Sequence, residues 1–91
     1  MKISIITATF NSEKNIAECL QSVARQTYKN IEHIIIDGGS KDKTIQIIKS
    51  ASSVTKYLSE PDKVILEALD EGIKLASGEV FGFLLTNDMN G

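Results

Sequence analysis

The run Ile34-Ile35-Ile36 restricts the fold most strongly, because it leaves no polar position for a solvent-facing side of a strand. A strand that is apolar at consecutive positions is typical of a sheet covered on both faces. The run ends at Asp37-Gly38-Gly39, a sequence that favours a turn. The segment from Lys2 to Ala8 is also rich in β-branched residues and shows little alternation. Both segments therefore predict strands of a parallel sheet with helices on each side.

Three segments between the strands have apolar residues at helical spacing. The first helix is predicted to follow a cap at Asn11 or Ser12 and to end near residues 25 to 28. The second is expected to start at Ser40 or Asp42, and the third to end at Gly78 in the left-handed conformation common after helices. The expected buried positions are Ile16, Cys19, Leu20 and Val23 in the first helix, Thr44, Ile47, Ile48 and Ala51 in the second, and Ile65, Ala68, Leu69, Ile73 and Ala76 in the third.

The other strands are predicted at Ile31 to Ile36, Val54 to Leu58 and Val80 to Leu85. Lys56 suits a short strand near a sheet edge. The order of elements is then βαβαβαβ, and right-handed crossovers favour the strand order 3-2-1-4. We therefore expect residues 1–91 to form one three-layer, Rossmann-like α/β domain.

In this order the winding of the sheet reverses between the first and fourth strands. The loops that follow strands 1, 2 and 4 meet at such a point, where ligands of open α/β sheets bind. The loops are Thr7 to Asn11, Asp37 to Ser40, and Thr86 to Asp88. A ligand crevice is expected there.

Asp37 is the main candidate for ligand contact, because it follows a buried strand and precedes two glycines that allow close backbone approach. Its carboxylate can accept hydrogen bonds from a base or a ribose. The same pattern is equally consistent with Asp37 capping a turn whose glycines supply positive φ. For Asp42, which precedes Thr44 by two residues, a structural role at the helix start is favoured.

Asp88 can hold a divalent cation from the loop after the fourth strand, with Asn87 and Thr86 as auxiliary oxygen donors. One aspartate is a weak metal motif, and Asn-Asp pairs are frequent in ordinary turns. His33 lies in the middle of a strand, where packing is the favoured interpretation. No Ser-His-acid or Cys-His set surrounds it, and neither a G-x-G-x-x-G nor a Walker-type motif is present.

Composition excludes several other classes of protein. Residues 1–50 carry seven Lys or Arg against five Asp or Glu, and residues 51–91 carry three against seven, so neither half predicts a nucleic-acid surface. The single cysteine, Cys19, excludes a disulfide framework. The N-terminal apolar run is too short and polar for a signal peptide or membrane span. A cytoplasmic protein without a membrane span is expected.

Four segments resemble the family 2 glycosyltransferases of GT-A fold, which transfer sugars from nucleotide donors. The resemblance covers nearly all of the chain, and the motifs together are highly specific. The segments are Ile3 to Asn11; Cys19 to Val23 with Gln26-Thr27-Tyr28; Ile34 to Thr44, as Asp-Gly-Gly-Ser-x-Asp-x-Thr; and Ser59-Glu60-Pro61-Asp62-Lys63 followed by Gly72-Ile73, Ala76-x-Gly78 and Gly82-Phe83-Leu84.

The resemblance implies a function for the crevice. A nucleoside-diphosphate sugar is expected to contact Thr7, Thr9, Asp37, Gly38 and Asp88, with Mn or Mg held by Asp88. Asn87 stands where the family usually has a first aspartate, so metal affinity is expected to be lower. Other departures from the family pattern are Val64, Leu66 and Leu85.

The resemblance also implies that residues 1–91 are the donor-binding half of a truncated GT-A domain. The acceptor-binding half and the catalytic base would lie beyond Gly91, and no residue of this chain is assigned as that base. Sugar transfer by these residues alone is therefore not expected. The alternative is an inert module, natural or redesigned, that binds nucleotide or associates with itself through the fourth strand.

Overall fold

The computed structural model describes residues 2–25, 30–61 and 64–87. Its four strands are β1 (Ile3–Phe10), β2 (Ile31–Asp37), β3 (Lys56–Ser59) and β4 (Glu79–Asn87). All pairings are parallel, and the order is β3-β2-β1-β4. The predicted order 3-2-1-4 is confirmed.

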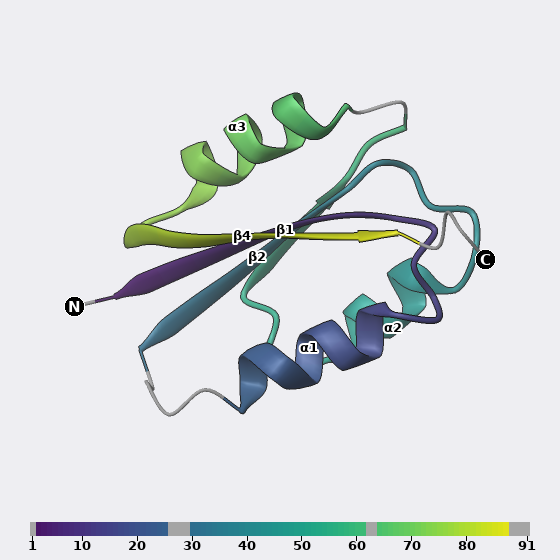
Figure 1. Cartoon of the computed structure of the whole chain (residues 1–91), viewed down its shortest axis with the longest axis horizontal. Coiled ribbons are helices and arrows are strands. Elements are labelled where there is room, and N and C mark those ends of the chain that lie inside the picture. The colour runs from purple at the N-terminus through teal and green to yellow at the C-terminus, as the bar shows by residue number, and fades with distance from the viewer. Residues whose placement is uncertain (1, 26–29, 62–63, 88–91) are drawn as a thin grey trace.

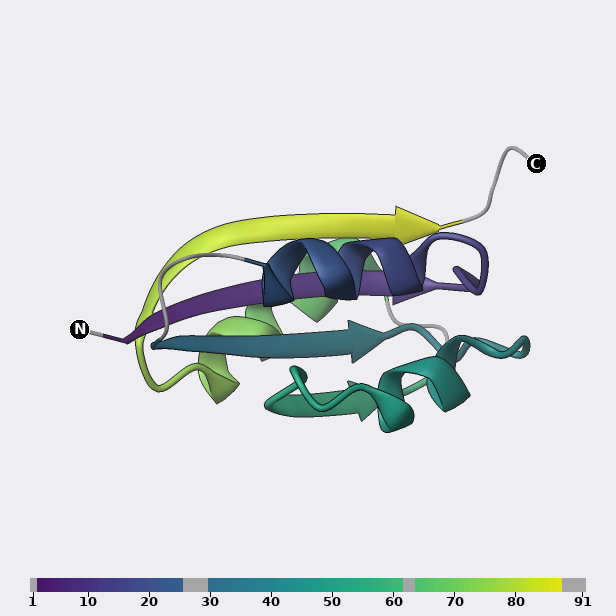
Figure 2. The ribbon, with the colours of Figure 1, turned by 90° about the horizontal axis from the view of Figure 1, so that it is seen from below.

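Three helices cover the sheet in the predicted three-layer arrangement. They are α1 (Ile16–Ala24), α2 (Thr44–Ser50) and α3 (Ile65–Leu75). Figure 1 shows α3 on one face of the sheet, with α1 and α2 on the other. Figure 2, turned by 90°, shows the strands side by side, with β4 and β3 at opposite edges.

The isoleucine run of β2 supplies both halves of the core. Ile34 and Ile36 point toward α3, where they pack with Ile6, Ala8 and Ala68. Ile35 points the other way and packs with side chains of α1 and α2. All three isoleucines are fully buried, each worth roughly 1.5–3 kcal/mol of transfer free energy. The sheet is therefore covered on both faces at β2, as the run predicts.

Two predicted helix starts are wrong. Helix α1 begins at Ile16, not directly after Asn11 or Ser12, because residues 12–15 form a turn in which the Ser12 carbonyl accepts hydrogen bonds from the N–H groups of Asn15 (2.9 Å) and Ile16 (2.7 Å). Helix α2 begins at Thr44, after Ser40 and Asp42. In both places the polar residues form hydrogen bonds that join the loop after β1 to the loop after β2.

The predicted left-handed role of Gly78 is also wrong. Among the described residues only Asn11 and Gly39 have positive φ, and α3 already ends at Leu75 with Ala76 extended. A Cβ at Gly78 would lie 2.5 Å from the carbonyl oxygen of Lys2. Glycine is needed here because the α3–β4 connection crosses the start of β1 closely.

A buried carboxylate ties the amino-terminal ends of the strands together. Glu32 of β2 is 3% exposed. Its Oε1 accepts from the Ser4 hydroxyl (2.8 Å) and the Ser77 N–H (2.9 Å), and its Oε2 accepts from the Ser77 hydroxyl (3.0 Å) and meets Lys56 Nζ at 3.3 Å. Burial alone raises the pKa of this carboxyl, but the donors from Ser77, Ser4 and Lys56 outweigh it and lower the pKa to about 2. Glu32 is therefore charged in the folded protein.

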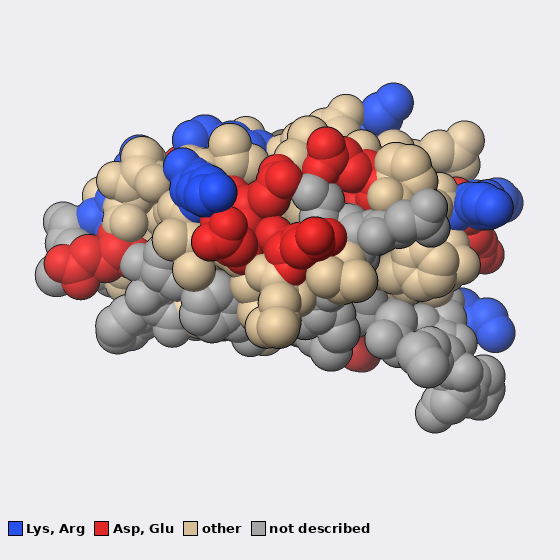
Figure 3. All heavy atoms as spheres, turned by 90° about the horizontal axis from the view of Figure 1, so that it is seen from above, with Lys and Arg blue, Asp and Glu red and all other residues tan. Residues whose placement is uncertain are grey.

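Acidic side chains also gather at the surface on the α3 side, which Figure 3 shows. Helix α3 itself carries Glu67, Asp70 and Glu71. Phosphate groups are not attracted to such a face.

None of the described helices is long and apolar enough to cross a bilayer.

We expect Glu32 to stabilise the fold in a pH-dependent way. Because its folded pKa is lowered from 4.5 to about 2, its contribution is complete above pH 4.5 and is lost as pH falls toward 2. Glu32→Gln should lower the free energy of unfolding by about 2–3 kcal/mol at pH 7 and reduce its loss between pH 7 and pH 3. Urea unfolding measures both effects. The exposed Glu79→Gln is the control, and equal stability of the two variants at pH 7 would contradict this role.

Two glycines offer a matched test of core packing. A Cβ at Gly72 of α3 would overlap the Cγ2 atom of the fully buried Ile6, whereas a Cβ at Gly82 of β4 would meet no atom within 4 Å. Gly72→Ala should therefore destabilise the protein by about 1–2 kcal/mol despite the better helix propensity of alanine. Gly82→Ala should not. Thermal unfolding of both variants measures the difference, and a stabilised Gly72→Ala variant would show that α3 packs less tightly on β1.

Candidate functional site

Polar residues line the carboxyl edge of the sheet. Thr9, Asp37 and Ser59 are register partners across β1, β2 and β3. The Gly38 N–H donates to the carbonyl of Thr9 at 2.9 Å. The structure thus brings Thr9, Asp37 and Gly38 together at the edge where the crevice was expected.

The carboxylate of Asp37 receives hydrogen bonds from two segments of the chain. Its Oδ2 accepts from the N–H groups of Gly39 (2.9 Å) and Ser40 (2.7 Å) and from the hydroxyl of Ser59 (2.9 Å). Its Oδ1 accepts from the Ser40 hydroxyl alone among the described groups. Asp37 is only 1% exposed, so these donors replace water around a buried charge.

The way these donors are divided between the two oxygens bears on both interpretations of Asp37, as a turn cap and as a ligand contact. The bonds to Gly39 and Ser40 are those of a turn cap, so the structural interpretation is correct. A carboxylate has about four acceptor positions over its two oxygens, and Oδ1 uses one of its two. Asp37 therefore caps its turn and keeps acceptor capacity for a ligand donor.

Gly39 fixes the shape of this turn. It has φ of +92°, and a Cβ at this position would lie 2.6 Å from Cα of Pro61. The positive φ thus belongs to Gly39 and not to Gly38. The Glu60 N–H donates to the carbonyl of Asp37 at 2.9 Å, so the segment after β3 packs directly on the turn.

The loop after β1 is joined to the same turn from the other side. Asn11 has φ of 45°, its N–H donates to the Ser40 hydroxyl (2.7 Å), and its Oδ1 accepts from the Lys41 N–H (2.9 Å). The Ser12 N–H donates to the Thr44 hydroxyl at 2.7 Å. Asn11 and Ser40 therefore connect the first loop to Asp37.

Asp42 and Glu13 extend this connection to the start of α2. Asp42 accepts from the N–H groups of Thr44 (3.0 Å) and Glu13 (3.2 Å), and the Glu13 carboxylate accepts from the Lys43 N–H (3.1 Å). Burial raises the pKa of Asp42, but the hydroxyl and amide donors lower it by more, so the net shift is downward. The structural role favoured for Asp42 agrees with these bonds.

The sequence placed Asn11 and Ser40 in the loops of the expected site but assigned neither of them a role, and it did not place Ser59 at the site. Asn11 carried one usable signal, since asparagine tolerates positive φ better than most residues. Ser40 and Ser59 both lie in segments that resemble the family, but their hydrogen bonds to Asp37 could not be predicted, because serines after strands are common in turns.

Thr7, which the resemblance assigns to the nucleoside, lies in the interior. Its side chain is fully buried, with Oγ1 2.7 Å from Nε2 of His33 and 4.0 Å from Sγ of Cys19. Burial lowers the pKa of His33 to about 4, so its ring is neutral at pH 7, and burial raises the pKa of Cys19 against the opposing effect of the Thr7 hydroxyl. His33 is packed, as the sequence favoured, and its Nδ1 has no hydrogen-bond partner among the described residues.

The residues expected to bind metal lie largely outside the part of the chain that the structure describes. Asp88 is beyond the described residues, and Asn87 is described only as the backbone end of β4, paired with Phe10. Within residues 2–25, 30–61 and 64–87, no three His, Cys, Asp or Glu side chains gather as metal ligands. The metal expectation therefore rests on the resemblance.

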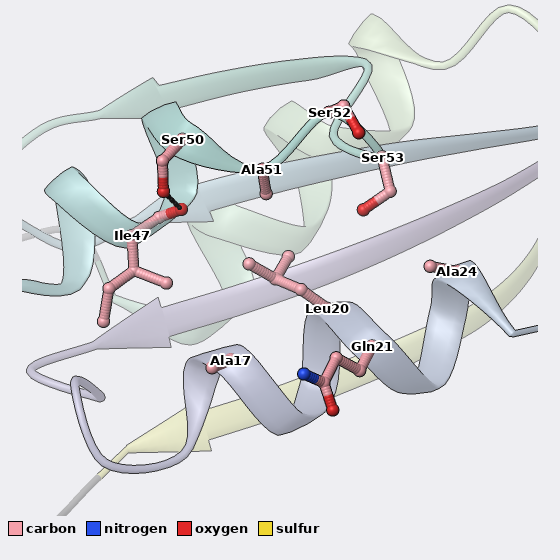
Figure 4. Close-up of a pocket in the computed structure, with 9 residues that line it drawn as sticks. All are labelled: Ala17, Leu20, Gln21, Ala24, Ile47, Ser50, Ala51, Ser52 and Ser53. Carbon is pink, nitrogen blue, oxygen red and sulfur yellow. Dashed lines mark hydrogen bonds between the residues drawn. The ribbon is translucent and has the colours of Figure 1, made fainter.

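A cavity of about 360 Å³ lies elsewhere, between α1 and α2. Figure 4 shows its lining side chains, of which Leu20 and Ile47 are the large apolar ones. The others are alanines, serines and Gln21, and none is charged. The residues that line this groove carry no charge to balance that of a diphosphate, so we place the candidate site at the sheet edge.

Comparison with known sequences agrees with the fold and the motifs. The profile of the family described as Glycosyl transferase family 2 matches residues 4–86. A dolichyl N-acetyl-alpha-D-glucosaminyl phosphate 3-beta-D-2,3-diacetamido-2,3-dideoxy-beta-D-glucuronosyltransferase from Methanococcus voltae is 41% identical over 87 residues. That alignment covers 87% of this chain and 27% of the relative.

Solved structures show the same fold. Residues 1–349 of S. aureus TarS, in complex with UDP, superpose with a TM-score of 0.81 at 33% identity, over 94% of this chain and 27% of that fragment. The mannosyltransferase PcManGT of Pyrobaculum calidifontis, in complex with GDP-Man and Mn²⁺, gives a TM-score of 0.79 at 23% identity, over 87% of this chain and 26% of that protein. The chain thus spans about a quarter of the Methanococcus relative and of PcManGT, and 16% of the longer TarS structure. By its sequence and its GT-A fold, it belongs to glycosyl transferase family 2.

Proposed function

We propose that this chain is the donor-binding part of a glycosyltransferase and binds a nucleoside diphosphate sugar at the carboxyl edge of the sheet. The observation that carries the proposal is the buried carboxylate of Asp37, which keeps acceptor capacity on Oδ1 at the carboxyl end of β2. Strand β2 is the neighbour of β1, and the sheet reverses its winding between β1 and β4. The complex of TarS with UDP supports a nucleotide as the ligand class.

The roles at the edge follow from the chemistry of each residue. Asp37 accepts a hydrogen bond from an N–H of the base or from a ribose hydroxyl. Gly38 lets the backbone approach the nucleoside, and Thr9, its hydrogen-bond partner, lies beside it. Thr7 is buried, and its hydrogen bond with His33 joins β1 to β2 inside the sheet. The exposed Lys41 lies next to Ser40, where it can attract the phosphates.

A divalent cation, Mn or Mg, would be held by Asp88 with help from Asn87. When bound, such an ion neutralises charge that develops on the leaving diphosphate. Asparagine in place of a second carboxylate lowers the charge of the site, so we expect weak metal binding. The Mn²⁺ complex of PcManGT supports metal as part of this fold's chemistry.

The complete protein would transfer the sugar to a hydroxyl acceptor. In an inverting transfer, a carboxylate removes the acceptor's proton as its oxygen attacks the anomeric carbon. No residue of this chain is assigned that task, since the described acidic residues at the edge are already bonded within loops. Turnover therefore belongs to the longer protein in this proposal.

Asp37→Asn tests the site directly. It removes the charge and puts an amide where four donors now meet a carboxylate, so we expect the Kd for UDP to rise about tenfold or more. Isothermal titration with UDP, with and without Mn, measures this change. The matched control is Asp42→Asn, which alters a carboxylate of the neighbouring helix start and should bind UDP like the parent chain.

Two results would reject the proposal. One is the absence of heat for any nucleotide at millimolar concentration with the parent chain. The other is an equal loss of affinity in both variants, because disturbance of the loops would then explain it without a contact between Asp37 and ligand.

A second candidate function is self-association through β4. In the described sheet β4 pairs with β1 alone and is nine residues long, so its other edge can accept a further strand. Leu84 on this strand is 40% exposed. The same edge suits either a second copy of this chain or the remainder of a longer protein.

Sedimentation velocity at several concentrations distinguishes a self-associating chain from a monomer that binds nucleotide. A dimer through β4 predicts a sedimentation coefficient that rises with concentration over the micromolar range. A concentration-independent monomer that still binds UDP would rule out the second candidate and leave the first.

A further inference from the structure

We propose that Ser59 is a positioning residue for the nucleotide, holding the carboxylate of Asp37 so that Oδ1 faces the ligand. The inference rests on the proposed function. It concerns a residue that neither the motifs nor the comparisons assign.

Ser59 differs from the other donors to Asp37 in where it comes from. The Gly39 and Ser40 donors belong to the turn of Asp37 itself, only two and three residues away. Ser59 is 22 residues away and lies at the end of β3. It is therefore the long-range contact that fixes this carboxylate relative to the sheet.

The bond adds a third donor to Oδ2, the oxygen that already accepts from the two N–H groups of the turn. With Ser59, Oδ2 has three donors and Oδ1 has one. Without Ser59, Oδ1 would still have one donor and Oδ2 two, all from the turn of Asp37 itself. The carboxylate would then have no donor from β3 and would gain freedom to turn about χ2, a broad torsion. Ser59 thus acts on the ligand through Asp37 and need not touch the ligand.

The fold does not depend on this hydroxyl. Ser59 is exposed, and its strand is held on β2 by backbone pairing from Ile34 with Lys56 to Asp37 with Ser59. The bond from Glu60 N–H to the Asp37 carbonyl, together with Pro61 against Gly39, keeps the following segment in place. Removal of the hydroxyl should therefore change binding more than stability.

Three variants of the full 91-residue chain test the inference: Ser59→Ala, Ser59→Thr and Ser52→Ala. Threonine keeps the hydroxyl, and Ser52 is an exposed serine in the turn after α2. Titration with UDP should give a Kd about five- to tenfold higher for Ser59→Ala, and within twofold of the parent for Ser59→Thr and Ser52→Ala. In ligand-free protein, the amide resonances of Gly39 and Ser40 should move in Ser59→Ala and return toward the parent positions in Ser59→Thr.

Failure of this inference is distinct from failure of the proposed function. If the parent chain binds UDP and Ser59→Ala binds within twofold of it, or Ser59→Thr binds as poorly as Ser59→Ala, the positioning role is wrong and the site stands. If the parent chain does not bind UDP, the proposed function is wrong, and the positioning role is rejected with it even where the amide resonances respond.

Discussion

The hydrogen bonds to the buried carboxylate of Asp37 are the interaction on which the carboxyl edge of the sheet depends. A carboxylate without water requires donors, and the chain supplies them from the Gly39-Ser40 turn and from the end of β3. Ser40 passes the connection on to the first loop, since its hydroxyl also accepts from the Asn11 N–H. One charge therefore organises three loops that the sheet topology only brings near each other.

Strand β2 carries a second buried carboxylate, and the contrast with Asp37 separates structure from function. Glu32 lies near the opposite end of β2, on the α3 side, and each of its oxygens has two partners. Its acceptor capacity is used within the fold, which fits a purely structural role. Asp37 has three donors on one oxygen and one on the other. The unequal sharing leaves an acceptor position on Oδ1 for the ligand donor that we propose.

The sequence predicted the layers, the strand order and the approximate place of the site, because these follow from apolar patterns and from crossover handedness. It misplaced the starts of α1 and α2, because Asn11 and Ser12 bond to Ser40, Lys41 and Thr44, about 30 residues away. No local rule reveals such pairings. It gave Gly78 a conformational role when the cause is contact with Lys2. The role of Ser59 was not predicted for the same reason, since its hydrogen-bond partner Asp37 is 22 residues away.

The most direct test of the account is a ¹H–¹⁵N titration of the chain with UDP in the presence of Mg²⁺, which reports where the nucleotide lies. Binding at the sheet edge predicts the largest amide shift changes at Thr9, Gly38 and Ser40, saturating with UDP concentration. The α1–α2 groove, lined by Gln21 and Ser53 among others, should remain unchanged. Largest changes in that groove, or none anywhere at millimolar UDP, would contradict the account.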